Sequence, residues 1–414
     1  MRILYLSCHA ALEYDELRLL AGLGHEVFSV HGAYQVPHAP ADSLRPPLPL
    51  PRYPALEAIA RQCTRERLDP RLVAWADVIL VMHAPEWITN NWHLYRGKRV
   101  IWRSIGQSTP RTERMLRPYR RLGLEVVRHS PGDLRIPGNI GADAIIRFYK
   151  DPKEFCGWTG HTNEVITLNR SMRARAAACN FAAFVALARG FNARVYGHGN
   201  EDTGPFHGGA LDYEAMKQKL REARVYLYTG TKPAGYTLGL VEAMMTGIPV
   251  VAIGPRWGDV GWGTYEVHHI IRNGVDGFVS DDLGYLRQCI ARLLQDRGLA
   301  TAIGHNGRQR AIALFGEAAI RAQWAALLGR PHRGVRSGRR RVRSGLRRPF
   351  GRVLSGRSYW RRRLLRRRRL LRRRRGGLRR RGFSRGRLRL HAVFRRVAPR
   401  RKLARRITGL RHGR

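Results

Sequence analysis

RVYLYTGTKPAGYTLGLVEAMMTGIPVVAIGPRWG, residues Arg224–Gly258, is the stretch that decides the fold class of this 414-residue chain. Val225–Tyr228 predicts a buried strand, because it is short, apolar and rich in β-branched and aromatic residues. A polar loop, Thr229–Gly235, leads into a segment whose apolar residues recur at helical spacing, and Ile248–Ile253 predicts a second buried strand. The loop therefore lies at the carboxyl end of a strand, where open α/β sheets bind ligands.

The start of this predicted helix favours an anion. Its first turn, residues 236–239, has no acidic side chain, so its amides and the positive end of its dipole are open to a diphosphate. Gly235 permits close approach of a phosphate or sugar, although a flexible loop glycine is the alternative. Glu242 lies further along, where a carboxylate can accept hydrogen bonds from sugar hydroxyls unless it is a plain solvated helix residue. We therefore predict binding roles for Gly235, Tyr236, Thr237 and Glu242.

The same stretch resembles the donor-binding segment of retaining glycosyltransferases with the GT-B fold, of the large family 4 type (glycosyl transferases group 1). Those proteins carry a Glu, seven residues, a second Glu, then Ala-Met and a Gly-x-Pro-Val-Val strand. Glu242-Ala243-Met244 and residues 247–251 match this pattern, whereas the first Glu falls at Ala234. In the family the first acid lies near the donor sugar and the second near the ribose. The resemblance thus implies nucleotide binding more strongly than turnover.

Strands alternate with helical patterns through the first 330 residues, which predicts parallel sheets wrapped by helices. We predict an α/β fold with two Rossmann-like domains facing a cleft and a basic low-complexity C-terminal tail. The expected boundaries are 1–150 for an N-terminal acceptor domain, 151–330 for a C-terminal donor domain and 331–414 for the tail. The opening, with Leu-Gly-His-Glu-Val at 23–27, also resembles GT-B N-terminal domains, and it lacks the dinucleotide fingerprint Gly-x-Gly-x-x-Gly.

The positive charge is concentrated in the tail. Of the 77 Lys and Arg residues, 36 lie between Pro331 and Arg414, where no Asp or Glu occurs. Leucine pairs separate its arginine blocks, which is compatible with a helix stripe on an anionic membrane. Nucleic-acid binding by counterion release and a disordered extension without a selected role are the alternatives. The body keeps 41 basic and 30 acidic residues and is only mildly basic.

The cysteines indicate a reducing compartment. All five are scattered and no Cys-x-x-Cys pair occurs, so neither a disulfide framework nor a zinc site is predicted. The N-terminal apolar run, Ile3–Leu6, is too short for a signal peptide, and we expect no run of about 20 apolar residues that would cross a bilayer. We expect a cytoplasmic location, with peripheral attachment to the inner membrane face as an extension of the tail hypothesis.

Arg170 follows a predicted strand at the carboxyl end of the second sheet. The resemblance places a Gly-Arg pair here, with the arginine on the donor diphosphate; in this chain Asn169 replaces the glycine. The family's downstream lysine is missing, and Arg173 or Arg175 is its expected substitute. A solvated surface arginine is the alternative for Arg170.

Two histidines follow predicted strands of the first domain. Many family 4 members have a histidine that contacts the donor sugar, and the resemblance assigns this catalytic position to His83; a core or surface histidine is the alternative. His9 is the rival, because an inverting enzyme would need a base to deprotonate the acceptor hydroxyl. A retaining enzyme needs none, since the leaving phosphate can take that proton. Glu266 is expected to accept a hydrogen bond from the donor sugar or nucleotide.

The resemblance implies a glycosyltransferase, hexosyltransferase-like, that moves a sugar from a nucleotide-diphosphate sugar to an acceptor hydroxyl with retention. No Asp-x-Asp pair has the context of a divalent-metal site, so we expect neither metal nor cofactor, with the diphosphate charge met by arginine and helix amides. The acceptor, whether glycan, lipid or small molecule, is not specified. A sugar-nucleotide epimerase and a non-catalytic binding protein, favoured by Ala234, are the alternatives.

Overall fold

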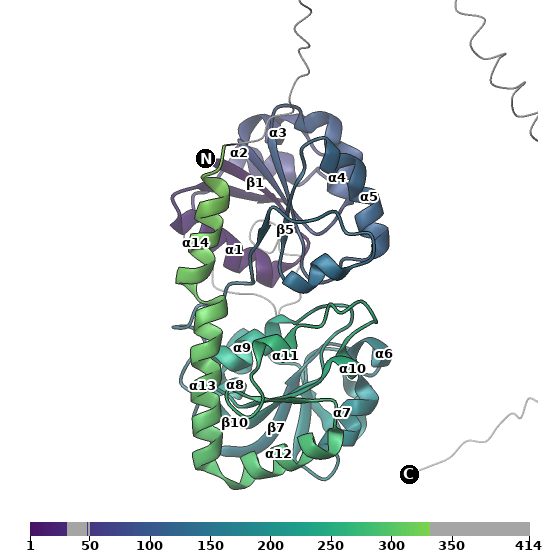
Figure 1. Cartoon of the computed structure of the whole chain (residues 1–414). Helices are drawn as coiled ribbons and strands as arrows, with labels where there is room; N and C mark the ends of the chain where they lie inside the picture. Colours follow the sequence, from purple (N-terminus) through teal and green to yellow (C-terminus); the bar gives the residue numbers. More distant parts are fainter. Residues whose placement is uncertain (31–47, 49, 332–414) are drawn as a thin grey trace, which may run out of the picture. The chain divides into compact units, whose positions relative to one another are not determined.

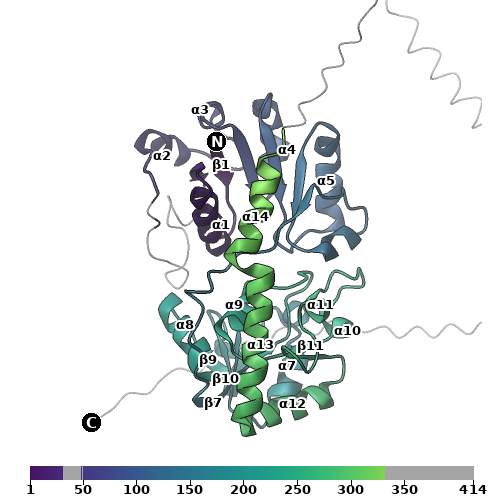
Figure 2. The same ribbon diagram turned by 60° about the vertical axis from the view of Figure 1, so that its left-hand side comes forward.

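The computed structural model describes residues 1–30, 48 and 50–331. The predicted tail from residue 332 onward lies outside this described part. The described residues form two α/β lobes, each built on a parallel six-stranded sheet with helices on its faces (Figures 1 and 2). The prediction of two Rossmann-like α/β domains is confirmed.

The first lobe has the strand order β2-β1-β3-β4-β5-β6, with every pairing parallel. The strands are β1 (Arg2–Leu6), β2 (Glu26–Val30), β3 (Val78–Met82), β4 (Arg99–Arg103), β5 (Glu125–Arg128) and β6 (Ala144–Ile145). The helices are α1 (Ala10–Gly22), α2 (Pro54–Ala60), α3 (Pro70–Trp75), α4 (Glu86–Asn91) and α5 (Pro110–Arg121), with short 3-10 turns at η2 (Trp92–Tyr95) and η3 (Pro131–Arg135). All side chains of β3 and β4 are buried, as expected for central parallel strands covered on both faces.

The second lobe has the order β12-β11-β10-β7-β8-β9. Its strands are β7 (Thr162–Leu168), β8 (Ala193–Tyr196), β9 (His207–Gly209), β10 (Ala223–Tyr228), β11 (Val250–Ile253) and β12 (Phe278–Ser280). Its helices are α6 (Ala176–Cys179), α7 (Phe181–Ala188), α8 (Tyr213–Glu222), α9 (Leu238–Thr246), α10 (Pro255–Gly258), α11 (Val267–Ile270), α12 (Leu283–Gln295) and α13 (Arg297–Phe315), with a 3-10 turn at η4 (Glu201–Phe206).

The strand–loop–helix–strand unit forms where the sequence predicts it. All six residues of β10 are buried, and β10 pairs in parallel with β11. α9 begins after Thr237, whose backbone is extended and whose side chain makes no capping hydrogen bond. The helix ends at Gly247, where a φ of 95° favours glycine. The loop before α9 thus lies at the carboxyl end of β10, with the first amides of the helix beside it.

The chain returns to the first lobe at the end of the described part. α13 packs against α9, whereas α14 (Glu317–Leu328) contacts α1 and β6 (Figures 1 and 2). Arg99 of β4 holds the end of α14, because its guanidinium donates to the carbonyl oxygens of Leu327 (2.8 Å) and Leu328 (3.0 Å). The same guanidinium pairs with Glu125 at 2.8 Å. A buried arginine therefore satisfies carbonyls that a helix end leaves open.

One stretch within the described residues, 297–328, is long and apolar enough to cross a membrane by length and composition alone. The sequence had suggested no such run. The stretch comprises α13 and α14, and part of it, including Phe315 and Trp324, belongs to the buried core. Core helices pass the same test, so this finding is weak evidence for a membrane span.

The contact between α13 and α9 depends on Gly304. A Cβ atom at this position would collide with the backbone carbonyl oxygen of Gly247 and lie 3.4 Å from the ring of Pro249. We expect Gly304→Ala to lower the free energy of unfolding by about 1–3 kcal/mol, because the helices must move apart. Gly298→Ala, at an exposed position of the same helix, is the matched control and should change stability by less than about 0.5 kcal/mol. Urea denaturation measures both, and equal stabilities of the two variants would contradict the packing argument.

Candidate functional site

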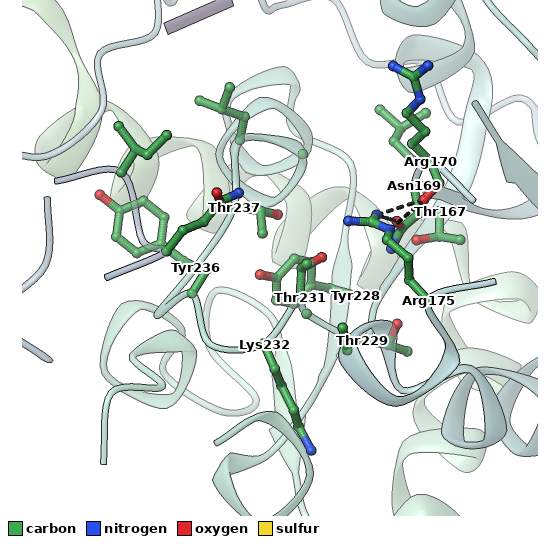
Figure 3. Close-up of a pocket in the computed structure, with 18 of the residues that line it drawn as sticks. Thr167, Asn169, Arg170, Arg175, Tyr228, Thr229, Thr231, Lys232, Tyr236 and Thr237 are labelled. Atoms are coloured by element: carbon green, nitrogen blue, oxygen red, sulfur yellow. Dashed lines mark hydrogen bonds between the residues drawn. The ribbon is translucent and has the colours of Figure 1, made fainter. Parts of the chain in front are cut away.

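A cavity of about 440 Å³ lies at the carboxyl ends of β7 and β10, and residues of both lobes line it. We call it the α9 cavity, because the start of α9 forms one wall (Figure 3). Its lining includes His9, Ile105, Gln107 and Phe148 on one side and Asn169, Arg170, Arg175, Thr229–Ala234 and Tyr236–Gly239 on the other. Three of the predicted binding residues, Arg170, Tyr236 and Thr237, are therefore brought together.

The entrance to α9 offers unused backbone donors. Thr237 and Leu238 line the cavity, no acidic residue occurs in the first turn, and no side chain caps the helix. Tyr236 is fully buried: its hydroxyl donates to the carbonyl oxygen of His129 (2.9 Å) and accepts from the amide of Phe148 (3.3 Å). Because the hydroxyl is committed to the first lobe, Tyr236 can offer the cavity its ring and its backbone. The arrangement suits an anion at the helix start.

Gly235 has a packing reason to be glycine. A Cβ atom there would lie 2.8 Å from the carbonyl oxygen of Thr264 and 3.2 Å from the hydroxyl of Ser130. Gly235 does not line the α9 cavity, so its predicted approach to a ligand stays a prediction. The glycine allows the loop before α9 to pack closely on the segment around Thr264, which fixes the direction in which the helix starts.

Two arginines line the α9 cavity from the segment after β7. Arg175 donates to the side-chain oxygen of Asn169 and to the carbonyl oxygen of Arg170, both at 2.7 Å, and these bonds are visible in Figure 3. Arg173 instead donates to the carbonyl oxygen of Asp202 and does not line the cavity. Of the two substitutes that the sequence left open, Arg175 is the one that accompanies Arg170. Both arginines line the cavity and bring positive charge that suits an anion, although Nε and Nη2 of Arg175 already donate to Asn169 and Arg170.

A second cavity, of about 270 Å³, adjoins the first. We call it the Glu242 cavity; it shares Leu168, Asn169, Arg170, Leu238 and Gly239 with the α9 cavity, and Glu242 lines only this one. Its remaining lining is mostly apolar or aromatic and comprises Ala11, Tyr196, Gly197, Leu211, Tyr213 and Met216. Arg170 and Glu242 thus face one common hollow, and an apolar surface lies beside them.

Glu242 belongs to a buried cluster of three charges. The ammonium of Lys150 lies 2.6 Å from Glu242 and 2.9 Å from Asp15, and all three side chains are less than a tenth exposed. The backbone amide of Lys150 also donates to the carbonyl oxygen of Phe315 at 3.0 Å. One cation therefore joins α1, the segment after β6 and α9. In a low-dielectric interior such charges are tolerated because each has an opposite partner.

Glu266 occupies a different position. It is buried, accepts a hydrogen bond from the hydroxyl of Ser130 at 2.5 Å and pairs with Arg147. It lines neither the α9 cavity nor the Glu242 cavity. Its carboxylate connects the second lobe to the first and to the segment after β6, and a role toward a donor stays a prediction.

His9 caps α1 and lines the α9 cavity. Its Nδ1 accepts from the amide of Leu12 at 3.4 Å, so the neutral ring carries its proton on Nε2. Desolvation, followed by the positive charge of Lys150, lowers its pKa below the usual range. A neutral imidazole in this tautomer donates a hydrogen bond from Nε2 and does not accept a proton there. His9 is thus arranged as a donor toward the cavity.

His83 lines a third cavity, of about 540 Å³, which we call the His83 cavity. Its φ of 56° is unusual for a residue with a side chain, and its backbone is fixed by hydrogen bonds with Arg103 (2.8 Å) and Trp102 (2.7 Å). Desolvation lowers the pKa of its imidazole to about 4, so the ring is neutral near pH 7. His83 does not line the α9 cavity, although His9, Ile105 and Gln107 line both.

Sequence reasoning missed a buried histidine after β5. His129 Nδ1 lies 3.0 Å from the carboxylate of Asp133, which also accepts from Ser104 at 2.5 Å. Its Nε2 has no hydrogen-bond partner in the described part of the chain. A Cβ atom on Gly106 would lie 3.1 Å from this nitrogen and 3.0 Å from the methyl group of Ala234. The available signal was the four-residue spacing of His129 and Asp133 directly after a predicted strand.

Among the described residues, no group of three or more histidine, cysteine or acidic side chains is placed to hold a metal ion.

No protein-family model matches this sequence, and no curated protein matches it. Solved structures of glycosyltransferases do match its fold. The sucrose-phosphate synthase of Thermosynechococcus elongatus is similar at a TM-score of 0.56 and 17% identity, covering 79% of this chain and 98% of its own. HepE of Anabaena, solved with UDP-glucose, gives 0.57 and 14%, covering 79% and 99%. A glycosyltransferase of Rickettsia africae gives 0.55 and 12%, covering 80% and 99%. Together with the sheet topology, these likenesses show the GT-B architecture.

Lys150 offers a direct test of the buried charge cluster. Lys150→Met leaves two carboxylates without their shared cation, so we expect the free energy of unfolding at neutral pH to fall by about 3–5 kcal/mol. Adding Glu242→Gln to Lys150→Met should restore part of the loss, because one uncompensated charge is removed. Lys153→Met, three residues away, provides a control, since Lys153 forms no ion pair within the described residues. Denaturant unfolding measures the free energy of unfolding of the wild type, the two single variants and the double variant. A Lys150→Met variant as stable as Lys153→Met would contradict the role assigned to the cluster.

Proposed function

We propose that the chain is a glycosyltransferase that moves a sugar, hexose-like, from a nucleotide-diphosphate donor to an acceptor hydroxyl, with retention and without metal. The observation that carries this proposal is the meeting of Arg170 and Glu242 in one hollow that continues to the uncapped start of α9. A carboxylate at one end, with a cation and helix amides beyond it, suits a ribose joined to a diphosphate.

The donor would lie across both cavities of the second lobe. Its diphosphate would accept hydrogen bonds from the first amides of α9, from Arg170 and from Arg175. Glu242 would accept from the ribose hydroxyls, and the apolar surface of Tyr213 and Met216 would contact the base. The UDP-glucose bound by the structurally similar HepE supports this class of ligand.

Retention is supported by the state of the two candidate bases. His9 has its Nδ1 occupied by a backbone amide, and His83 has a pKa of about 4, so neither is poised to accept a proton near pH 7. In the proposed reaction the bond between the anomeric carbon and the donor phosphate breaks, the acceptor oxygen bonds to that carbon, and the leaving phosphate oxygen takes the hydroxyl proton. His9 would donate from Nε2 to a sugar or phosphate oxygen at the boundary of the two lobes.

The finer assignments belong to the same proposal. Membership of the family 4 type is supported by the half motif at Glu242-Ala243-Met244 and the strand after it. A cytoplasmic location is supported by the scattered cysteines, and binding of the arginine-rich tail to an anionic membrane or to nucleic acid is supported by its charge alone.

A transfer assay with a panel of nucleotide sugars tests the proposal. The purified full chain is incubated with each donor alone and with mixed acceptor hydroxyls, and the products are separated by mass. We expect one donor to give released nucleotide and a glycosylated acceptor with unchanged anomeric configuration. An isomerised donor sugar without transfer would instead indicate the epimerase. Thermal protection by nucleotides with no sugar released from any donor would indicate a binding protein, as the replacement at Ala234 suggests.

Comparing the affinities of variants for a nucleoside and for its diphosphate distinguishes the proposed ribose contact from the proposed phosphate contacts. Glu242→Gln should weaken binding of the nucleoside and of its diphosphate alike, by about tenfold, because one charge-assisted hydrogen bond is lost. Arg175→Ala should weaken the diphosphate by about tenfold and leave the nucleoside unchanged. Arg173→Ala, whose side chain lies outside the cavity, is the control. Calorimetric titration measures these affinities, and a Glu242→Gln variant with wild-type affinity for both ligands would refute the ribose contact.

A further inference from the structure

The His83 cavity lies at the carboxyl edge of the first sheet. Its lining comes from residues after β1, β3 and β4, from the loop before α3 and from the first turns of α5, and comprises Cys8, His9, Arg65, His83, Ala84, Pro85, Glu86, Ile105, Gln107, Arg111, Thr112 and Met115. A volume of about 540 Å³ is in the range of small-molecule sites. The proposed function places no ligand in this cavity.

Two arginines in this cavity have no partner in the described part of the chain. The guanidinium groups of Arg65 and Arg111 form no ion pair and no hydrogen bond with described residues, whereas Arg99, Arg103 and Arg128 are each paired with a carboxylate. Arg65 and Arg111 come from separate segments and line the same hollow. Both residues are exposed, and two unpaired guanidinium groups lining one cavity favour an oxyanion with several acceptor oxygens.

The surrounding charges leave this preference intact. Glu113, in the first turn of α5, is fully buried and forms a bidentate pair with Arg128 at 2.7 and 2.8 Å, so its charge is already compensated. Glu86 is the single carboxylate among the lining residues, against two arginines. His83 is neutral near pH 7, and its buried Nδ1 has no hydrogen-bond partner among the described residues. The cavity therefore carries net positive charge together with groups that suit hydroxyls.

The His83 cavity and the α9 cavity share a wall. His9, Ile105 and Gln107 line both, so a molecule in the His83 cavity lies next to the place proposed for the donor sugar. We infer that the His83 cavity binds the acceptor, and that the acceptor carries a phosphate group held by Arg65 and Arg111. That the bound molecule is an acceptor rests on the proposed function. That Arg65 and Arg111 bind a phosphate group does not. Glu86 and His83 would contact the hydroxyls.

The test measures phosphate binding apart from transfer. The full chain, with Arg170→Ala and Arg175→Ala introduced to remove the phosphate contacts of the α9 cavity, is titrated with glycerol 3-phosphate and with uncharged glycerol. We expect the phosphate ester to bind and glycerol to bind at least about tenfold more weakly. Adding Arg65→Ala or Arg111→Ala should weaken the ester by about tenfold or more.

Arg114→Ala is the matched control, because Arg114 is an exposed arginine of α5 that does not line the cavity. Equal affinity of the ester for the Arg65, Arg111 and Arg114 variants would overturn the inference, as would equal affinity for the ester and glycerol. Vesicles of phosphatidylcholine with and without phosphatidic acid form a second arm, in which the unchanged tail contributes equally to every variant. Binding that depends on Arg111 only with phosphatidic acid would identify the phosphate as a lipid headgroup.

Failure of the two proposals is distinguishable. If the ester binds through Arg65 and Arg111 but no donor sugar is ever transferred, the phosphate site stands and the transferase proposal falls. If transfer proceeds to an uncharged acceptor, with a KM that Arg65→Ala and Arg111→Ala leave unchanged, the transferase stands and the phosphate-bearing acceptor is wrong.

Discussion

A single buried ammonium group is the constraint on which the proposed site depends. Lys150 contacts carboxylates from α1 and α9, and its backbone is bonded to the end of α13. Three segments far apart in sequence are therefore held at one point, directly behind the Glu242 cavity. The carboxylate of Glu242 is held at the wall of this cavity by its pair with Lys150, and a carboxylate suits hydroxyl groups as ligands. The part of the hollow where we propose a phosphate lies instead beside Arg170 and the start of α9.

Contacts between the lobes are polar as well as apolar. Glu266 of the second lobe accepts a hydrogen bond from Ser130 of the first lobe and pairs with Arg147. The guanidinium of Arg99 donates to the carbonyl oxygens at the end of α14. Each of these groups is largely buried, so separating them would expose charges that have lost their partners. The boundary between the lobes is thus defined by specific pairs, and the cavities on either side of His9 have fixed walls.

The part of the site that a local pattern determines was predictable from the sequence. The strand, loop and helix around Thr237 and Glu242 formed as expected, since apolar spacing and the closing glycine act within a few residues. Lys150 and His129 could not be recognised in this way, because their partners approach only when separate strands align. The choice between Arg173 and Arg175 depended on the path of an irregular segment, which spacing alone does not reveal. Glu266 was expected to contact the donor from a glycine-rich loop, and in the structure it contacts Ser130 and Arg147.

Tyr236 couples the position of the start of α9 to any movement between the lobes. Its hydroxyl is bonded to backbone groups of the first lobe, while its own backbone immediately precedes the start of α9. Any rotation that parts the lobes must either break both bonds or pull the first turn of α9 out of position. By thermodynamic linkage, a ligand that stabilises the first turn of α9 also opposes separation of the lobes. Separation of the lobes would in turn lower the affinity for that ligand. The hydroxyl of Tyr236 thus links the separation of the lobes to the position of the first turn of α9.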